Sequence, residues 1–148
     1  MKWYIKVIKN YAAFDSRASR REFIWFHITN VLLVLAFSLV VSGAAFAVML
    51  FSTGLTVGSE SLGAILTGSV VSSLILSAGG AVLLFYDLFL FIPSLALTVR
   101  RLHDAEHSWL FLFISLIPII GGLMLLVLLF TKGNDGANKY GRNPLEER

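Results

Sequence analysis

The sequence predicts an all-α fold: an integral membrane helical bundle of three transmembrane helices, preceded by an amphipathic interfacial helix. Hydrophobic residues make up 57% of the 148 residues and charged residues only 14%, whereas soluble domains average about 45–50% apolar and about 25% charged residues. Charged residues also avoid the long apolar runs, because residues 23–99 contain only Glu60 and Asp87, and residues 107–131 contain none. We therefore expect one membrane domain over residues 1–148.

The net charge of +3 and the absence of cysteine exclude several classes of function. Lysines and arginines lie at the two ends of the chain and in residues 99–108, beside the apolar runs, where such residues anchor helices in a bilayer. They form no basic face on a soluble fold, so nucleic acid is not an expected partner. Without cysteine there is no disulfide, thiolate nucleophile or cysteine-ligated metal.

Residues 2–14 form the predicted interfacial helix. Apolar and aromatic residues recur in it at helical spacing: Trp3, Val7, Tyr11 and Phe14. Lysines occupy the other side of the helix: Lys2, Lys6 and Lys9. A basic face opposite an aromatic one suits the headgroup region of an anionic leaflet. The alternative is a short helix that packs on the bundle.

Residues 20–51 form the predicted first span. Ser19 and Glu22 have the S-x-x-E spacing of a capping box, so the helix should begin near Arg20. The apolar run from Ile24 to Phe51 would be about 42 Å long as a helix, which exceeds the hydrocarbon core of about 30 Å, so the helix must tilt or project. The run is also too long for the apolar region of a signal peptide, about 7–15 residues.

Residues 52–72 are predicted to be an outer loop or an interfacial or re-entrant segment, because serine, threonine and glycine dilute their hydrophobicity. The second span is predicted over residues 73–98. Residues 62–99 are long for one span and short for two with a turn between them. Two spans there are the alternative, which would give four spans in all.

Residues 99–108 form a predicted polar hinge, residues 109–130 the third span, and residues 131–148 an irregular tail rich in turn-forming residues. With three spans and the N-terminus inside the cell, eight lysines and arginines would lie on the cytoplasmic side and four outside. Four spans would place ten inside and two outside, which charge alone favours.

Several motifs of the chain resemble those of a known family. They are the entry Ser16-Arg17-Ala18-Ser19-Arg20-Arg21-Glu22-Phe23, the hinge Arg100-Arg101-Leu102-His103-Asp104, Pro93, Ser108-Trp109, Pro118 with Gly121, and Gly133, Gly136, Asn138, Tyr140-Gly141 and Pro144 in the tail. Over nearly its whole length the sequence resembles the small bacterial inner-membrane proteins known as domain of unknown function 805. The resemblance implies an uncharacterised multi-pass protein of the bacterial inner (plasma) membrane, and it implies no established activity.

Two arginine clusters carry the leading functional hypothesis. If the chain has three spans, the entrance of the first span and the exit of the second lie at the same leaflet, and five guanidiniums share one surface. The planar guanidinium binds phosphate in a bidentate manner. We expect a non-enzymatic module that binds anionic lipid, a membrane-protein partner or a second copy through these residues: Arg17, Arg20, Arg21, Arg100, Arg101, His103 and Asp104. The alternative is that the arginines only anchor the topology.

Asp87 lies within the second predicted span, where an ionisable residue costs about 2.5–3.5 kcal/mol on insertion scales and by default marks function or a paired interior position. We expect it to face protein. A cluster of three intramembrane polar residues is geometrically possible: His27, Asn30 and Asp87. A small transporter or channel subunit that uses Asp87 is the alternative function, and a hydrogen-bonded structural residue is the plainer interpretation.

His103 and His107 are four residues apart, a spacing that can chelate zinc on a helix. The pattern of the resembling family lacks His107, which favours a polar turn in which Asp104 pairs with an arginine. We therefore expect no metal, no cofactor and no catalytic residue. A membrane enzyme acting at His103 and Asp104 is the third hypothesis.

Overall fold

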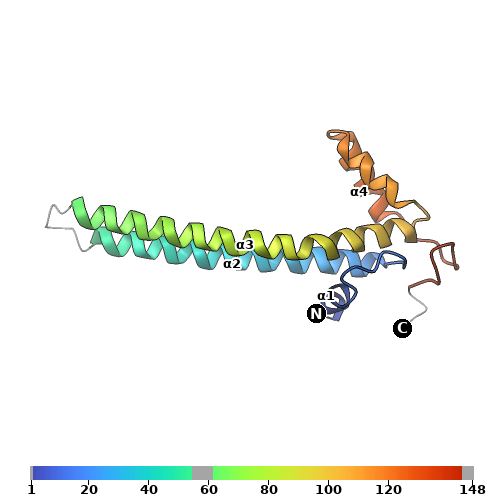
Figure 1. Ribbon diagram of the computed structural model, residues 1–148, viewed down its shortest axis with the longest axis horizontal. Coiled ribbons are helices and arrows are strands. Elements are labelled where there is room, and N and C mark those ends of the chain that lie inside the picture. Colours follow the sequence, from blue (N-terminus) through green and yellow to red (C-terminus); the bar gives the residue numbers. More distant parts are fainter. Residues whose placement is uncertain (1, 55–61, 145–148) are drawn as a thin grey trace. The chain divides into compact units, whose positions relative to one another are not determined.

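The computed structural model describes residues 2–54 and 62–144, and these residues fold into helices joined by turns (Figure 1). The elements are α1 (Lys2–Lys9), α2 (Arg20–Gly54), α3 (Leu62–Asp104), the 3₁₀ helix η1 (Trp109–Leu116) and α4 (Ile120–Phe130). Two of them, α2 and α3, are long and apolar enough to cross a membrane. The predicted all-α membrane class is confirmed, whereas the predicted count of three spans is not. Glu60 lies outside the described residues.

The chain divides into two compact units, which we call unit 1 (residues 1–29 and 90–148) and unit 2 (residues 30–89). Both long helices contribute to each unit. Unit 1 also contains α1, η1, α4 and the tail, and all of the lysines and arginines of the sequence.

Unit 2 is an antiparallel pair formed by residues 30–54 of α2 and residues 62–89 of α3 (Figure 1). Small residues let the two helices approach closely. The Ser72 hydroxyl donates to the Ala45 carbonyl over 3.0 Å, and a Cβ added to Gly79 would overlap the Val41 side chain. Many large apolar side chains of the pair are exposed, as expected for helices that face lipid.

Helix α3 is longer than predicted at both ends. It begins at Leu62 rather than near residue 73, and it continues to Asp104 through most of the predicted hinge. The hydroxyls that dilute its hydrophobicity donate to carbonyls of their own helix, as Thr67 does to Gly63 over 2.7 Å and Ser73 does to Val70 over 2.8 Å. Serine and threonine bonded in this way are compatible with a helix in apolar surroundings.

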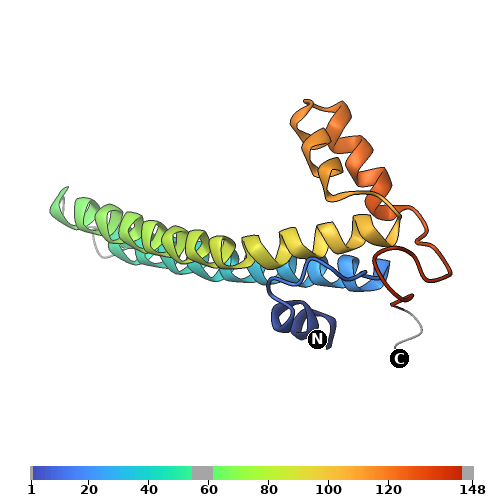
Figure 2. The same cartoon turned by 45° about the vertical axis from the view of Figure 1, so that its right-hand side comes forward.

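Residues 109–130 do not form the single helix that was predicted. They form η1 and α4, which lie side by side (Figure 2). Pro118 lies in the connection and lacks a backbone N–H donor, and Ile119 has a φ of 66°, a left-handed conformation that a β-branched residue rarely adopts. The apolar segment therefore turns back on itself.

The N-terminal helix also differs from its predicted range, because α1 ends at Lys9 rather than at Phe14. It packs on the start of α2, since the rings of Tyr4 and Phe26 stack with centroids 5.2 Å apart. Val7 is fully buried. These contacts are those of the alternative in which the helix packs on the bundle.

Candidate functional site: a buried arginine and carboxylate network

Unit 1 gathers charged side chains from three parts of the chain: the segment before α2, the first turn of α2 and the end of α3. We call this the arginine network and define it by five buried residues: Arg17, Glu22, Arg100, Arg101 and Asp104. The predicted meeting of residues from both arginine clusters is found.

Asp104 is the centre of the arginine network. Its Oδ1 accepts from Arg17 Nε over 2.9 Å and lies 2.8 Å from another nitrogen of the same guanidinium. Its Oδ2 accepts from Arg101, one helical turn earlier on α3. The predicted pairing of Asp104 with an arginine is confirmed, and the carboxylate is shared by two arginines. An ion pair of this kind needs further hydrogen bonds to offset the loss of water around its members.

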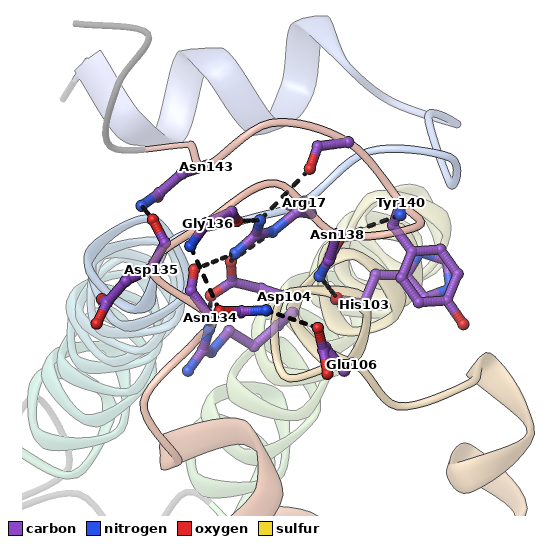
Figure 3. A network of polar contacts seen from close by, with 12 residues as sticks. Arg17, His103, Asp104, Glu106, Asn134, Asp135, Gly136, Asn138, Tyr140 and Asn143 are labelled. Atoms are coloured by element: carbon purple, nitrogen blue, oxygen red, sulfur yellow. Dashed lines mark hydrogen bonds and ion pairs between the residues drawn. The ribbon is translucent and has the colours of Figure 1, made fainter.

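Arg17 obtains those further bonds from the tail. It donates to the carbonyls of Asn134 and Gly136, both over 2.6 Å (Figure 3). The tail is fastened to α3 as well, because Asn134 N donates to the Asp104 carbonyl over 3.1 Å and Asn138 Nδ2 donates to the His103 carbonyl over 2.9 Å. The predicted irregular extension is thus a segment with defined partners.

Arg101 holds the end of α4. Its guanidinium donates to the carbonyl of Leu129 over 2.8 Å and to the carbonyl of Thr131. The Leu129 carbonyl lies in the last turn of α4 and the Thr131 carbonyl at its C-cap, so neither has a partner further along the helix. A cation at this position also interacts favourably with the helix dipole. Arg17 and Arg101 therefore link the tail and the end of α4 to Asp104.

Glu22 is the second carboxylate of the arginine network. Its amide donates to Ser19 Oγ over 3.3 Å, which confirms Ser19 as the N-cap of α2. Its side chain does not complete a capping box; it lies 3.1 Å from Lys6 Nζ and 3.4 Å from Arg100 Nη1. Two cations attract the carboxylate more strongly than one backbone amide does. Arg100 keeps Nε and Nη2 buried without a hydrogen-bond partner in the described part of the chain.

A cavity of about 260 Å³ lies beside the arginine network. Three cationic residues line it: Arg20, Arg21 and Lys132. Lys132 lies 2.6 Å from Asp135, a pair in which both side chains are more than two-thirds exposed. Within residues 2–54 and 62–144, neither Arg20 nor Arg21 forms an ion pair. Sequence reasoning had found the arginines of this cavity but not Lys132, which is distant in sequence.

The two histidines of the predicted hinge, His103 and His107, make different contacts. His103 is buried and its ring stacks on Tyr140, with centroids 3.8 Å apart. His107 Nδ1 lies 2.6 Å from the Ala105 carbonyl. No group of three or more histidine or acidic residues that could hold a metal occurs among the residues described.

The three intramembrane polar residues have different surroundings. Asn30 Oδ1 accepts from Tyr86 Oη over 2.7 Å, and His27 Nδ1 lies 3.0 Å from the Phe23 carbonyl. Asp87 is exposed on the single chain. Because lipid solvates a carboxylate poorly, the predicted protein contact of Asp87 would have to come from a membrane partner or a second copy. The structure adds no observation in favour of transport through Asp87.

The comparison with known proteins agrees with the resemblance noted from the sequence. The family model described as Protein of unknown function (DUF805) matches residues 11–142, which include the whole arginine network. The chain belongs to this family. Similar proteins include the inner membrane protein YhaI of Escherichia coli (strain K12), which is 33% identical over 144 residues that cover 97% of this chain and 96% of the relative.

A second relative is the inner membrane protein YhaH of the same strain, 29% identical over 97% of both chains. No solved structure matches the chain significantly. Membership of the DUF805 family and two apolar helices long enough to cross a bilayer make the protein a multi-pass protein of the bacterial inner membrane.

Proposed function

We propose that this DUF805 protein is a non-enzymatic inner-membrane module that binds the phosphate of an anionic lipid in the cavity lined by Arg20, Arg21 and Lys132. The single observation that carries the proposal is the cavity itself, because it gathers three cations from the start of α2 and from the tail. Guanidinium groups bind phosphate oxygens with two parallel hydrogen bonds.

The charges around the cavity support an anionic ligand of Arg20 and Arg21. Asp135 lines the cavity and pairs with Lys132. Asp104 also lines the cavity, but both of its oxygens already accept from arginines. It is therefore a poor counterion for Arg20 and Arg21.

The same contacts divide the predicted binding residues into two sets. Arg17 and Arg101 are occupied with Asp104 and with backbone carbonyls, so their proposed role is to hold the site together. Among the residues that the structure describes, Arg20 and Arg21 form no ion pair, and they are proposed to contact the ligand. The non-enzymatic part of the proposal is supported by Asp104, whose oxygens are engaged by two guanidiniums rather than available to a substrate.

Lipid retention in native mass spectra tests the proposal. We expect the Arg20→Gln, Arg21→Gln and Lys132→Gln triple variant to lose its preference for phosphatidylglycerol over phosphatidylcholine. Each cation near an anionic surface contributes about 1 kcal/mol, so the preference should fall about fivefold for each cation removed. Lys139→Gln is the matched control, since Lys139 is exposed and lies over the Tyr140 ring. Equal retention in the triple variant and the control would contradict the proposal.

We further propose that the chain crosses the membrane twice, with both termini in the cytoplasm. The 8 residues of η1 are about 16 Å long, and the 11 residues of α4 are also about 16 Å long. Each arm reaches about half of a hydrocarbon core of about 30 Å, as a re-entrant hairpin does. Two spans also place all 12 lysines and arginines on one side, in accord with the positive-inside rule.

Single cysteines introduced into this cysteine-free chain test the topology. We expect Ser16→Cys and Ala137→Cys, both at exposed positions, to react with a membrane-impermeant maleimide only after the cells are permeabilised. Gly54→Cys, at the other end of α2, should react in intact spheroplasts. Reaction of Ser16→Cys and Ala137→Cys from opposite sides of the membrane would establish an odd number of spans and refute the proposal.

A further inference from the structure

Asp87 is the one charged residue among residues 30–54 and 62–89 of unit 2. It is exposed, and it forms no ion pair within residues 2–54 and 62–144. Its neighbours on α3 are large and apolar, since Leu84 and Leu88 are each 60% exposed. An ionisable side chain within a span is costly in lipid, and such residues usually face protein or pair with one another. Asp87 therefore needs a partner that the described part of a single chain does not supply.

The contact between α3 and α2 shows how helices pack in unit 2. Four residues of α3 face α2: Gly68, Ser72, Gly79 and Tyr86. The two glycines are in close contact with α2, because a Cβ at either would overlap a side chain of that helix. Ser72 and Tyr86 add hydrogen bonds to α2 over 3.0 Å and 2.7 Å. We call these four residues the α2-facing stripe, which combines three small residues with one polar side chain that finds a partner.

A second stripe of similar composition follows one residue later along α3. Its members are Ser69, Ser73, Gly80 and Asp87, and all four are exposed. One residue is a rotation of about 100° around an α-helix, so the second stripe lies beside the α2-facing stripe on the helix surface. A Cβ added to Gly80 would meet nothing within 4 Å. The second stripe thus repeats the pattern of a helix contact at a place where the single chain offers no helix within that distance.

The length and chemistry of the second stripe fit a contact within the membrane. Ser69 and Asp87 are 18 residues apart, about 27 Å along a helix, which is close to the hydrocarbon core of about 30 Å. Small residues let two helices in a bilayer approach closely. The hydroxyls of Ser69 and Ser73 donate to carbonyls of their own helix, so Asp87 is the member of the stripe that requires a polar partner.

A second copy of the chain supplies that partner. Two copies inserted in the same direction, and related by a twofold axis along the membrane normal, place each residue near the axis opposite its own counterpart. Residues 22–99 contain no lysine or arginine, so a second copy offers no cation in its apolar helices. It offers the carboxyl group of its own Asp87. A carboxyl group that holds a proton both donates and accepts, so two such groups are complementary to each other.

We propose that the protein forms a homodimer in the membrane through the second stripe of α3, with the two Asp87 carboxyl groups hydrogen-bonded to each other across the twofold axis. The dimer removes both carboxyl groups from lipid and brings small residues of the two copies together: Ser69, Ser73 and Gly80. The proposal does not depend on the binding of anionic lipid, because Arg20, Arg21 and Lys132 lie outside unit 2.

Single-molecule photobleaching of the full chain in phosphatidylcholine vesicles tests the dimer. Each chain carries one fluorophore on Ala137→Cys, at an exposed position, and we expect most wild-type particles to bleach in two steps. Gly80→Leu should bleach in one step, because its side chain fits the open space on the single chain but keeps two α3 helices apart. Gly43→Leu is the matched control and should remain dimeric, since a Cβ at Gly43 on α2 also meets nothing within 4 Å. One-step bleaching of the wild type, or equal dimer fractions for the two leucine variants, would overturn the proposal.

Two substitutions of Asp87 test the carboxyl pair. Asp87→Leu should raise the dissociation constant of the dimer about three- to thirtyfold, as for the loss of an interhelical hydrogen bond in a membrane. Asp87→Asn should stay close to the wild type, because an amide also donates and accepts. An unchanged dissociation constant in Asp87→Leu would refute the pairing of the two Asp87 side chains.

Disulfide formation in membranes identifies the contacting face of α3. The chain contains no cysteine, so oxidation of Ser73→Cys should yield a covalent dimer. Val71→Cys is the control at nearly the same depth. Val71 is exposed and lies two residues from Ser73, about 200° away around the helix, so Val71→Cys should remain a monomer under denaturing electrophoresis. Equal yields of covalent dimer from the two variants would show that α3 does not pair through the second stripe.

Discussion

Asp104→Ala is expected to reduce the free energy of unfolding by about 3–5 kcal/mol, the range measured when one partner of a buried ion pair is removed. The carboxylate is 7% exposed and accepts from both Arg17 and Arg101. Its removal leaves two buried guanidiniums without their counterion. Both arginines also hold other segments, so the loss should loosen the tail and the end of α4 together. Unfolding of the purified protein in mixed micelles, followed by circular dichroism, measures the change.

Two further variants make this expectation specific. Asp104→Asn retains one carbonyl oxygen for Arg17 or Arg101 and presents an amide to the other, so its loss of stability should be smaller than that of Asp104→Ala but clear. Asp135→Asn breaks an ion pair whose carboxylate is 75% exposed, and exposed pairs contribute little. If Asp104→Ala unfolded at the same denaturant concentration as Asp135→Asn, the central role of Asp104 would be refuted.

Local signals in the sequence predicted much of the site. Ser19 and Glu22 marked the start of α2 at Arg20, which the structure confirms, because an N-cap depends only on neighbouring residues. Composition predicted the apolar helices because the hydropathy of a segment also depends only on the residues within it. The pairing of Asp104 with an arginine also followed from the sequence, since Arg101 lies one helical turn before it and such pairs face each other on a helix.

Contacts between distant segments could not be predicted in this way. Arg17 lies 117 positions from Asn134, whose carbonyl accepts from it, and no periodicity reports such a pair. One signal was nevertheless present: Gly133, Gly136 and Asn138 of the tail belong to the motifs by which the chain resembles its family. A Cβ added to Gly133 would overlap the Asp104 carboxylate, so the need for glycine there becomes clear only once the tail is folded against α3.

The hairpin formed by η1 and α4 was missed because its apolar composition is the same for one span and for two short arms. Hydropathy measures how apolar a segment is, and it does not show where the backbone reverses direction. Pro118 lies within the predicted third span, although a proline between two apolar segments is equally typical of a turn. The deciding feature is the close approach of Gly121 to η1, a contact that the sequence alone does not reveal.

Gly121→Ala is expected to disrupt this hairpin. A Cβ at the buried Gly121 would overlap the backbone carbonyl oxygen of Ile114 and lie 3.1 Å from the Ile117 Cβ. A backbone oxygen cannot rotate away as a side chain can, so η1 and α4 must separate, at a cost of about 1–3 kcal/mol or more for overpacking. Because Arg101 binds the last carbonyls of α4, the displacement should also reach the arginine network.

The neighbouring glycine provides a matched control for this prediction. A Cβ at Gly122 would meet nothing within 4 Å, and alanine is the better helix former by about 0.5–1 kcal/mol. We therefore expect Gly122→Ala to be neutral or slightly stabilising, whereas Gly121→Ala should unfold at lower denaturant concentration and be cleaved faster by protease at the connection around Pro118. Identical stability and protease sensitivity of the two alanine variants would show that residues 109–130 do not pack as η1 against α4.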